Sequence, residues 1–173
     1  MLVIHGSIAT DCLCLQRIPN RACDPRAQGA TGDGHTDDTL AIQAAIDACG
    51  RATGGTVALA CKATEDNCTF ATFPLKLSGN NTELRIEDSA TLRFSSARND
   101  SRWQGVAAAI LGSNVHDIAI TGGGTIDGNG SLWWDQCAGF SLNESGWSVC
   151  GRPGLFTLNP VQNVKSQAVY RCL

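Results

Sequence analysis

Short runs of apolar residues at every second position recur through most of the chain after Thr56. Such alternation places successive side chains on opposite faces of an extended strand, so each run predicts a β-strand with one buried face. Gly, Asn, Asp or Ser separates the runs, which is typical of tight turns. The runs cover residues 56–60, 74–77, 82–86, 90–94, 108–111, 115–120, 124–126 and 155–158. The chain is therefore predicted to be all-β apart from one helix.

A weak internal repeat indicates how these strands are arranged. Residues 80–86 align with 114–120, and 163–169 form a weaker third copy. Irregular repeats of short strands favour a parallel β-solenoid over a β-sandwich, the alternative, whose regular hairpin turns are not evident. In the third copy Gln167 takes the place of Ile118, and an inward Gln must find hydrogen-bond partners. We expect that rung to be poorly formed or wrongly registered.

One amphipathic helix is predicted over residues 37–49, ahead of the first strand. Thr36 is placed to be its N-cap, and Asp37 and Asp38 follow in the first turn, where carboxylates suit the positive helix end. Gly50 supplies a stop. The apolar face is formed by Ile42, Ala45, Ile46 and Cys49. Because a solenoid exposes its first rung, this helix is predicted to be an N-terminal cap.

Charge and hydropathy exclude several classes of protein. The chain of 173 residues has 13 Lys and Arg against 16 Asp and Glu, a net charge of −3, so we expect no nucleic-acid partner. A hydrophobic content of 43% excludes a disordered chain. The longest apolar run, 106–111, is far shorter than the roughly 18–20 residues that span a bilayer, so we expect no membrane partner.

Nine cysteines indicate an oxidising compartment. Zinc sites need closely spaced Cys and His ligands, and the histidines here are isolated from the close cysteine pairs, so neither a metal site nor a cofactor is predicted. Three local disulfide pairings are plausible, with Cys12, Cys14 and Cys172 left over. They are Cys23–Cys49, Cys61–Cys68 and Cys137–Cys150.

Five Asn-x-Ser/Thr sequons support the same compartment. All five lie in polar or Gly-rich stretches that are predicted to be loops, so a secreted, extracellular glycoprotein is expected. The sequons are Asn67, Asn80, Asn99, Asn129 and Asn143. Residues 1–20 are expected to be a poorly defined N-terminal leader without a convincing signal peptide, since a basic start is missing and Asp11 interrupts the apolar stretch.

Two groups of motifs resemble known proteins. Segments 32–39, 41–49 and 54–57 resemble the entry segment of pectin-lyase-like β-helix proteins. The stretch 122–130, Gly-Gly-Gly-Thr-Ile-Asp-Gly-Asn-Gly, is followed by Trp133-Trp134 and Arg152-Pro153, an order that resembles glycoside hydrolase family 28, the polygalacturonase family. The resemblance covers roughly residues 23–165. It implies a right-handed parallel β-helix, with residues 21–173 forming the N-terminal part of that domain.

The resemblance also implies a chemistry, the inverting hydrolysis of α-1,4-linked galacturonan in pectin by aspartates on adjacent rungs. Its motifs are Asn-Thr-Asp, Gly-Asp-Asp, Gly-His-Gly and Arg-x-Lys, and none occurs in this sequence. By the family's order they would lie beyond Leu173, so the helix is expected to be incomplete at its C-terminus and the chain inactive alone. No catalytic residue is therefore assigned, and the substrate-binding residues are left unassigned.

Two alternatives stay open: a degenerate β-helix protein that binds acidic polysaccharide such as pectate without cleaving it, and another pectin-lyase-like enzyme. If the β-helix is incomplete at its C-terminus, its exposed end would also favour edge-to-edge self-association between copies.

Arg152 has two possible roles. It could contact a uronic acid carboxylate or form a structural ion pair.

Other chemically reactive residues have simpler structural explanations. Asp37-Asp38 is explained by the start of the helix, and Asp127 by a strand-to-turn junction where its carboxylate accepts backbone hydrogen bonds. His35 and His116 are expected in turns or at the surface.

The Trp133-Trp134 pair could form a platform on which sugar rings stack. Adjacent residues of an extended segment face opposite ways, however, so one side chain is expected to pack inside and the other to be exposed.

Overall fold

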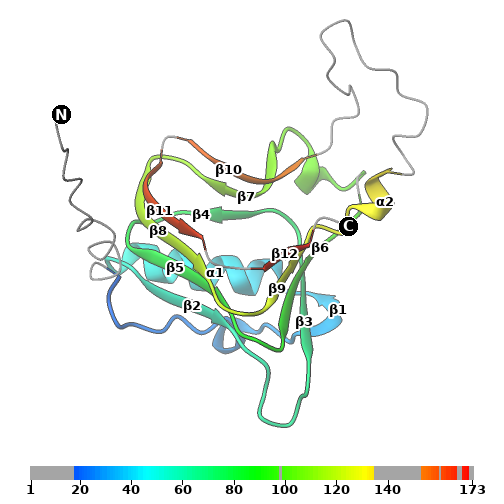
Figure 1. Cartoon of the computed structure of the whole chain (residues 1–173), viewed down its shortest axis with the longest axis horizontal. Helices are drawn as coiled ribbons and strands as arrows, with labels where there is room; N and C mark the ends of the chain where they lie inside the picture. The colour runs from blue at the N-terminus through cyan, green and yellow to red at the C-terminus, as the bar shows by residue number, and fades with distance from the viewer. Residues whose placement is uncertain (1–17, 98, 135–152, 160, 167–168, 172–173) are drawn as a thin grey trace, which may run out of the picture.

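The computed structural model describes residues 18–134 except 98, and then 153–159, 161–166 and 169–171. All strand pairs are parallel, and the strands form three sheets that enclose one core (Figure 1). The strands are β1 (Asp33–Asp37), β2 (Gly55–Leu59), β3 (Cys68–Thr72), β4 (Leu75–Leu77), β5 (Thr82–Ile86), β6 (Ala90–Phe94), β7 (Ala108–Gly112), β8 (Val115–Thr121), β9 (Thr125–Asp127), β10 (Gly154–Leu158), β11 (Val161–Ser166) and β12 (Val169–Arg171). The helices are η2 (Arg26–Gln28), α1 (Thr39–Arg51), η3 (Ser101–Trp103) and α2 (Ser131–Trp134).

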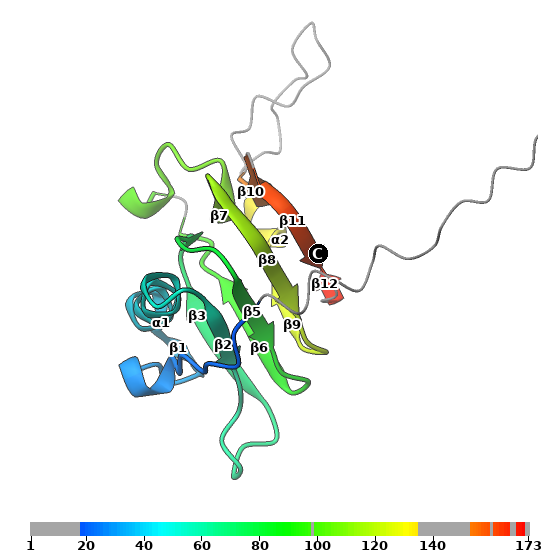
Figure 2. The same ribbon diagram turned by 90° about the vertical axis from the view of Figure 1, so that its left-hand side faces the viewer.

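Successive turns of the chain add one strand to each sheet, so the predicted parallel β-helix is confirmed. The sheet orders are β1-β3-β6-β9-β12, β2-β5-β8-β11 and β4-β7-β10. All eight predicted runs overlap strands, and β11 overlaps the weak third repeat copy, whereas β1, β3 and β12 were not among the predicted runs. Figure 2 shows the stack from the side, with α1 at one end and β11 and β12 at the other.

The core consists of columns of apolar side chains from consecutive rungs. Phe70, Leu92 and Ile126 are register neighbours on β3, β6 and β9, and all three are fully buried. Leu75 and Ile110 form a second column on β4 and β7. Burying such a side chain contributes about 1.5–3 kcal/mol, so stacked rungs stabilise one another by covering each other's apolar edges.

Helix α1 covers the first rung, as predicted, but its ends differ from the prediction. Thr36 lies in β1 and is not the N-cap; instead the Asp37 carboxylate accepts a hydrogen bond from the Thr39 backbone N–H at 3.0 Å. Gly50 is not a stop, since the helix continues to Arg51. A Cβ on Gly50 would lie 2.9 Å from the Gly79 Cα, so close packing explains this glycine.

The two repeat copies pair with a different register from that of the sequence alignment. Leu84 pairs with Ile120, not with Ile118. Counted back along this register, Asn81 falls at the position of Asp117, and both residues have a left-handed backbone, with φ of 54° and 55°. The side chain of Asn80 supports the turn, because its Oδ1 accepts the His116 N–H at 2.9 Å.

The third copy is displaced by three residues from its alignment. Val161 pairs with Val115 and Val164 pairs with Ile118. The rung was expected to be poorly formed or wrongly registered, and the second outcome holds: the true register gives the Ile118 position to Val164, not to Gln167. Gln167 itself lies outside the described residues.

Two disulfides join the first elements, at pairings that the cysteine spacing had suggested. Cys23–Cys49 links the segment before η2 to the end of α1, with a Cα–Cα distance of 5.9 Å. Cys61–Cys68 closes the loop between β2 and β3. The proposed Cys137–Cys150 pair and the remaining three cysteines lie outside the described residues.

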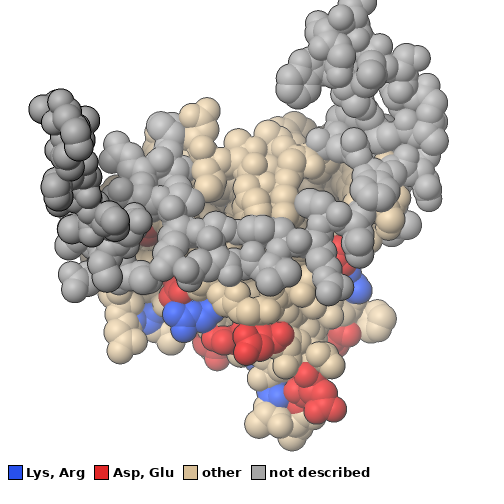
Figure 3. Space-filling model, viewed as in Figure 1, with Lys and Arg blue, Asp and Glu red and all other residues tan. Residues whose placement is uncertain are grey.

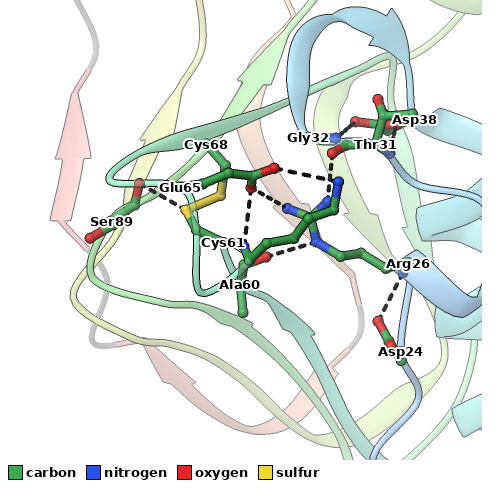
Figure 4. A network of polar contacts seen from close by, with 11 residues as sticks. Asp24, Arg26, Thr31, Gly32, Asp38, Ala60, Cys61, Glu65, Cys68 and Ser89 are labelled. Carbon is green, nitrogen blue, oxygen red and sulfur yellow. Dashed lines mark hydrogen bonds and ion pairs between the residues drawn. A yellow bond between two sulfur atoms is a disulfide. The ribbon is translucent and has the colours of Figure 1, made fainter.

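Arg26 ties the cap to the first rung through one guanidinium (Figure 4). Its Nε donates to the Ala60 carbonyl at 3.0 Å, Nη1 to the Thr31 carbonyl at 2.5 Å, and Nη2 to Glu65 at 3.1 Å. The guanidinium also lies 5.0 Å from the centre of the Phe70 ring. Charge-assisted bonds to three separate segments fix the chain where it enters the β-helix.

The glycine triplet at 122–124 is required by the spacing of the rungs. A Cβ on Gly122, whose φ is 103°, would lie 1.8 Å from the Ile86 carbonyl oxygen. Cβ atoms on Gly123 and Gly124 would lie 2.1 Å from Asp88 and 2.3 Å from the Glu87 carbonyl. Only glycine lets this turn stack directly on the turn beneath it.

Gly122→Ala tests this explanation against Gly105→Ala. Both glycines have a left-handed φ, but a Cβ at Gly105 meets nothing within 4 Å. The Gly105 variant should lose about 1–2 kcal/mol from backbone strain alone. The Gly122 variant should lose at least about 2 kcal/mol more, or fail to fold, because backbone atoms must move apart. Equal losses in urea unfolding would contradict the stacking explanation.

Removing each disulfide separately tests how much each bond contributes to the free energy of unfolding. The Cys23–Cys49 pair spans 26 residues and the Cys61–Cys68 pair spans 7. From loop-closure entropy, replacing both cysteines by Ala should cost about 3.5 kcal/mol for the long loop and about 2.5 kcal/mol for the short one. Denaturant unfolding of both double variants measures the difference. A larger loss for the short loop would show that chain entropy does not govern these bonds.

Candidate functional site

A groove lies where β1, β3 and β6 end, together with the turn after β9. Because parallel strands of one sheet run in the same direction, their carboxyl ends meet at one edge and bring distant residues together. The groove has a volume of about 240 Å³. It is lined by His35, Asp37, Ala71, Thr72, Phe73, Arg93, Phe94, Ser95, Ser96 and Asn129.

Arg102 sits beside the groove and organises one of its walls. It donates to Asp37 at 2.5 Å and, through separate nitrogens, to both carboxylate oxygens of Asp100 at 2.9 Å. Its guanidinium lies 3.4 Å from the centre of the Phe73 ring. The η3 segment, 65 residues after Asp37, is thereby joined to the start of α1.

The carboxylates of this wall are held in their ionised form. Burial raises the pKa of Asp37, but hydrogen bonds from Thr39 and Arg102 outweigh it and leave the pKa below its usual 3.8. The Arg102 side chain lowers the pKa of Asp100 to about 2. Backbone N–H groups of Thr36 and His35 lower the pKa of Asp33 as well. A general acid needs the opposite shift, so none of these carboxylates suits that role.

Arg93 lies on β6 and contributes the groove's own cation. Its Nη2 donates to the Gly34 carbonyl at 2.5 Å, which fixes the guanidinium between β6 and β1. No carboxylate of the described residues lies within 4.0 Å of it. Asp127, its register neighbour on β9, accepts the Asn129 backbone N–H at 2.8 Å. That contact matches the turn role predicted for Asp127.

Three aromatic rings support the groove from inside. Trp103 packs against Phe73, with ring centroids 6.4 Å apart, and edge-on against Trp133 at 5.3 Å. Trp133 is buried, as expected for one member of the tryptophan pair, and nothing is described of the Trp134 side chain. The cluster anchors η3 and α2 beside the groove, because apolar contact and ring geometry both favour this packing.

A second polar cluster lies on the sheet formed by β2, β5 and β8. The buried Glu83 carboxylate accepts hydrogen bonds from Thr121 at 2.5 Å, from Thr56 at 2.7 Å and from Arg85 at 2.9 Å. Burial raises the pKa of Glu83, but these bonds outweigh it and the net shift is downward. An ionised carboxylate with this many partners stabilises the sheet and is not available to transfer protons.

The other residues considered in the sequence have varied positions. Asp38 is buried and accepts the Thr31 and Gly32 backbone N–H groups at 2.7 and 3.1 Å, so it acts in the turn before α1. His116 is exposed, as expected, and its Nδ1 lies 2.8 Å from Asp117 Oδ2. His35 lines the groove. Arg152 lies outside the described residues.

His35, Asp37 and Asn129 were singled out in the sequence and line the groove, but sequence reasoning missed the arginines in and beside it. Arg93 and Arg102 carried no motif, and neither did Glu83 in the second cluster. The only sequence signal for Arg93 was its place between Leu92 and Phe94. Because those two side chains point inward, the alternation of a strand turns Arg93 to the outer face. Within the described ranges, no group of three or more His, Cys, Asp or Glu residues is placed to hold a metal ion.

Comparison with known proteins identifies what the chain is similar to. The sequence model of glycosyl hydrolases family 28 matches residues 61–169. The endo-xylogalacturonan hydrolase A of Aspergillus tubingensis is 35% identical over 157 residues, which are 87% of this chain and 35% of that protein.

Solved structures give the same result. The crystal structure of endo-xylogalacturonan hydrolase from Aspergillus tubingensis is 27% identical with a TM-score of 0.55, over 87% of this chain and 43% of that one. The exopolygalacturonase of Thermotoga maritima is 25% identical with a TM-score of 0.59, over 79% and 31%. The chain spans about a quarter to a third of the length of the curated relatives that it matches.

Arg102→Gln tests the wall through its dependence on pH. The pKa values of Asp37 and Asp100 are lowered in the folded state, so their pairing with Arg102 stabilises the protein above pH about 4 and is lost as pH falls toward 2. The difference in melting temperature between wild type and Arg102→Gln should therefore shrink between pH 4 and pH 2. The exposed Arg51→Gln serves as a control. A difference that is constant with pH would show that Arg102 acts only by packing on Phe73.

Proposed function

Because this chain belongs to glycosyl hydrolase family 28, we propose that its groove binds a galacturonan chain of the kind found in pectin. The observation that carries the proposal is the groove at the carboxyl ends of β1, β3 and β6, with Arg93 in its lining. The hydroxyl groups of Ser95 and Ser96 and the amide of Asn129 can hydrogen-bond sugar hydroxyls there.

The substrate class follows from chemistry shared by the relatives. They are named endo-xylogalacturonan hydrolase and exopolygalacturonase, and both names refer to a polymer of galacturonate. Each galacturonate unit carries one carboxylate and several hydroxyl groups. A groove with the cation Arg93 and several neutral hydrogen-bonding side chains, whose one carboxylate, Asp37, is already paired with Arg102, complements that pattern.

Hydrolysis needs groups that this sequence does not supply. Inversion requires a protonated acid and a second carboxylate about 6.5–9.5 Å away, with room for water between them. The carboxylates beside the groove are ionised and paired, and the family's four motifs do not occur in the 173 residues. We therefore propose that this chain binds galacturonan without cleaving it, and that cleavage belongs to family members that carry those motifs.

An extracellular location is supported by the two disulfides and is part of the proposal. Among the described residues, no helix is long and apolar enough to cross a membrane. Asn67 and Asn99 are exposed, so we propose them as the glycosylated sequons. Asn80 and Asn129 are partly buried, and a glycan on Asn129 would occupy the groove. Asn143 lies outside the described residues.

Binding and turnover can be measured on the same purified chain. Polygalacturonate should retard the chain in affinity electrophoresis, whereas neutral galactan should not. Incubation with polygalacturonate should release no reducing ends above a buffer blank. Release of reducing ends would refute the proposed absence of cleavage, and equal retardation by both polymers would refute the proposed substrate class.

A further inference from the structure

Arg93 is partly buried and has no ion pair among the described residues. Arg26, which is also partly buried, pairs with Glu65, and the exposed Arg102 pairs with Asp37 and Asp100. Arg93 instead donates one nitrogen to the Gly34 carbonyl, and no protein acceptor is assigned to its Nε or Nη1 in the described part of the chain. A partly buried guanidinium is desolvated by its surroundings, so a carboxylate that reached it would gain more than at the open surface.

The surroundings define what such an anion would be. Ser95, Ser96 and Asn129 line the groove with Arg93 and are neutral, and the one carboxylate in the lining, Asp37, is paired with Arg102. The nearest wall cation, Arg102, is already neutralised by two carboxylates. Figure 3 shows one face of the molecule, and the described side chains on that face carry charges of both signs. A single cation among hydroxyl groups fits a singly charged sugar acid better than a polyphosphate, which would need several cations.

We propose that Arg93 determines specificity by binding the carboxylate of one uronic acid unit in the groove. This inference rests on the proposed function and adds the residue that selects acidic over neutral or esterified units. The contact to Gly34 leaves the guanidinium oriented before the ligand arrives, so little side-chain freedom is lost on binding. Arg93 touches neither an acid nor a base that could take part in bond cleavage, so its role is recognition.

Isothermal titration of the full chain with trigalacturonate, and with its fully methyl-esterified form, tests this role. Wild type should bind trigalacturonate at least about tenfold more tightly than the ester, since a charge-assisted hydrogen bond is lost. Arg93→Gln should weaken trigalacturonate binding by about tenfold and remove the preference over the ester. Arg93→Lys keeps the charge without the planar fork and should retain part of the preference. Arg51→Gln removes a distant arginine and should change neither.

The outcomes separate this inference from the proposed function. If wild type binds neither ligand, the proposed function fails. If wild type binds trigalacturonate and Arg93→Gln binds it equally well, with an unchanged preference over the ester, the assignment of Arg93 fails while the proposed function stands. Thermal melts of each variant show whether loss of the Gly34 contact unfolds the groove. If Arg93→Gln is unfolded, the preference of folded Arg93→Lys decides, and an unchanged preference there overturns the assignment.

Discussion

Covering the first rung is the constraint on which the rest of this structure depends. A parallel stack leaves the apolar underside of its first turn exposed, and α1 covers it with a face that includes Ile42 and Ile46. The Asp38 carboxylate fixes the turn into the helix through buried backbone hydrogen bonds, and the Cys23–Cys49 bond fixes its far end. The same junction forms one side of the groove, since Asp37 accepts the backbone N–H of Thr39, the first residue of α1, and also pairs with Arg102. The cap and the candidate site therefore share their supports.

Much of the fold could be predicted because the core is periodic. Strands with alternating aliphatic residues were visible in the sequence, and so was the apolar face of α1. β1 contains no aliphatic residue and stays largely exposed, so no apolar alternation marks it. The buried side of β3 is formed by Cys68, Phe70 and Thr72, a set that does not read as an aliphatic strand. The register between β5 and β8 was missed because alignment of similar letters matches Leu84 to Ile118, whereas the stacked strands pair Leu84 with Ile120.

The candidate site was less predictable, because its residues have no neighbours in sequence that mark them. Arg93 and Gly34 are 59 residues apart, and Arg102 and Asp37 are 65 apart. Only the three-dimensional register brings them to one edge of the sheet. Residues that looked reactive in the sequence, Asp38 and Asp127, make structural turns. The family resemblance gave the substrate class, but its motifs for catalysis are not among these residues, so it could not mark the groove.

Native-state hydrogen exchange tests the central claim, that the cap and the first rungs are one cooperative unit. If α1 is needed to cover the stack, the amides of its buried face and those of β2 and β5 should exchange through the same opening, with one shared free energy. The shared value should fall together when denaturant is added. Rapid exchange throughout α1 while β2 and β5 stay protected would show that the rungs are stable without their cap, and would contradict the account.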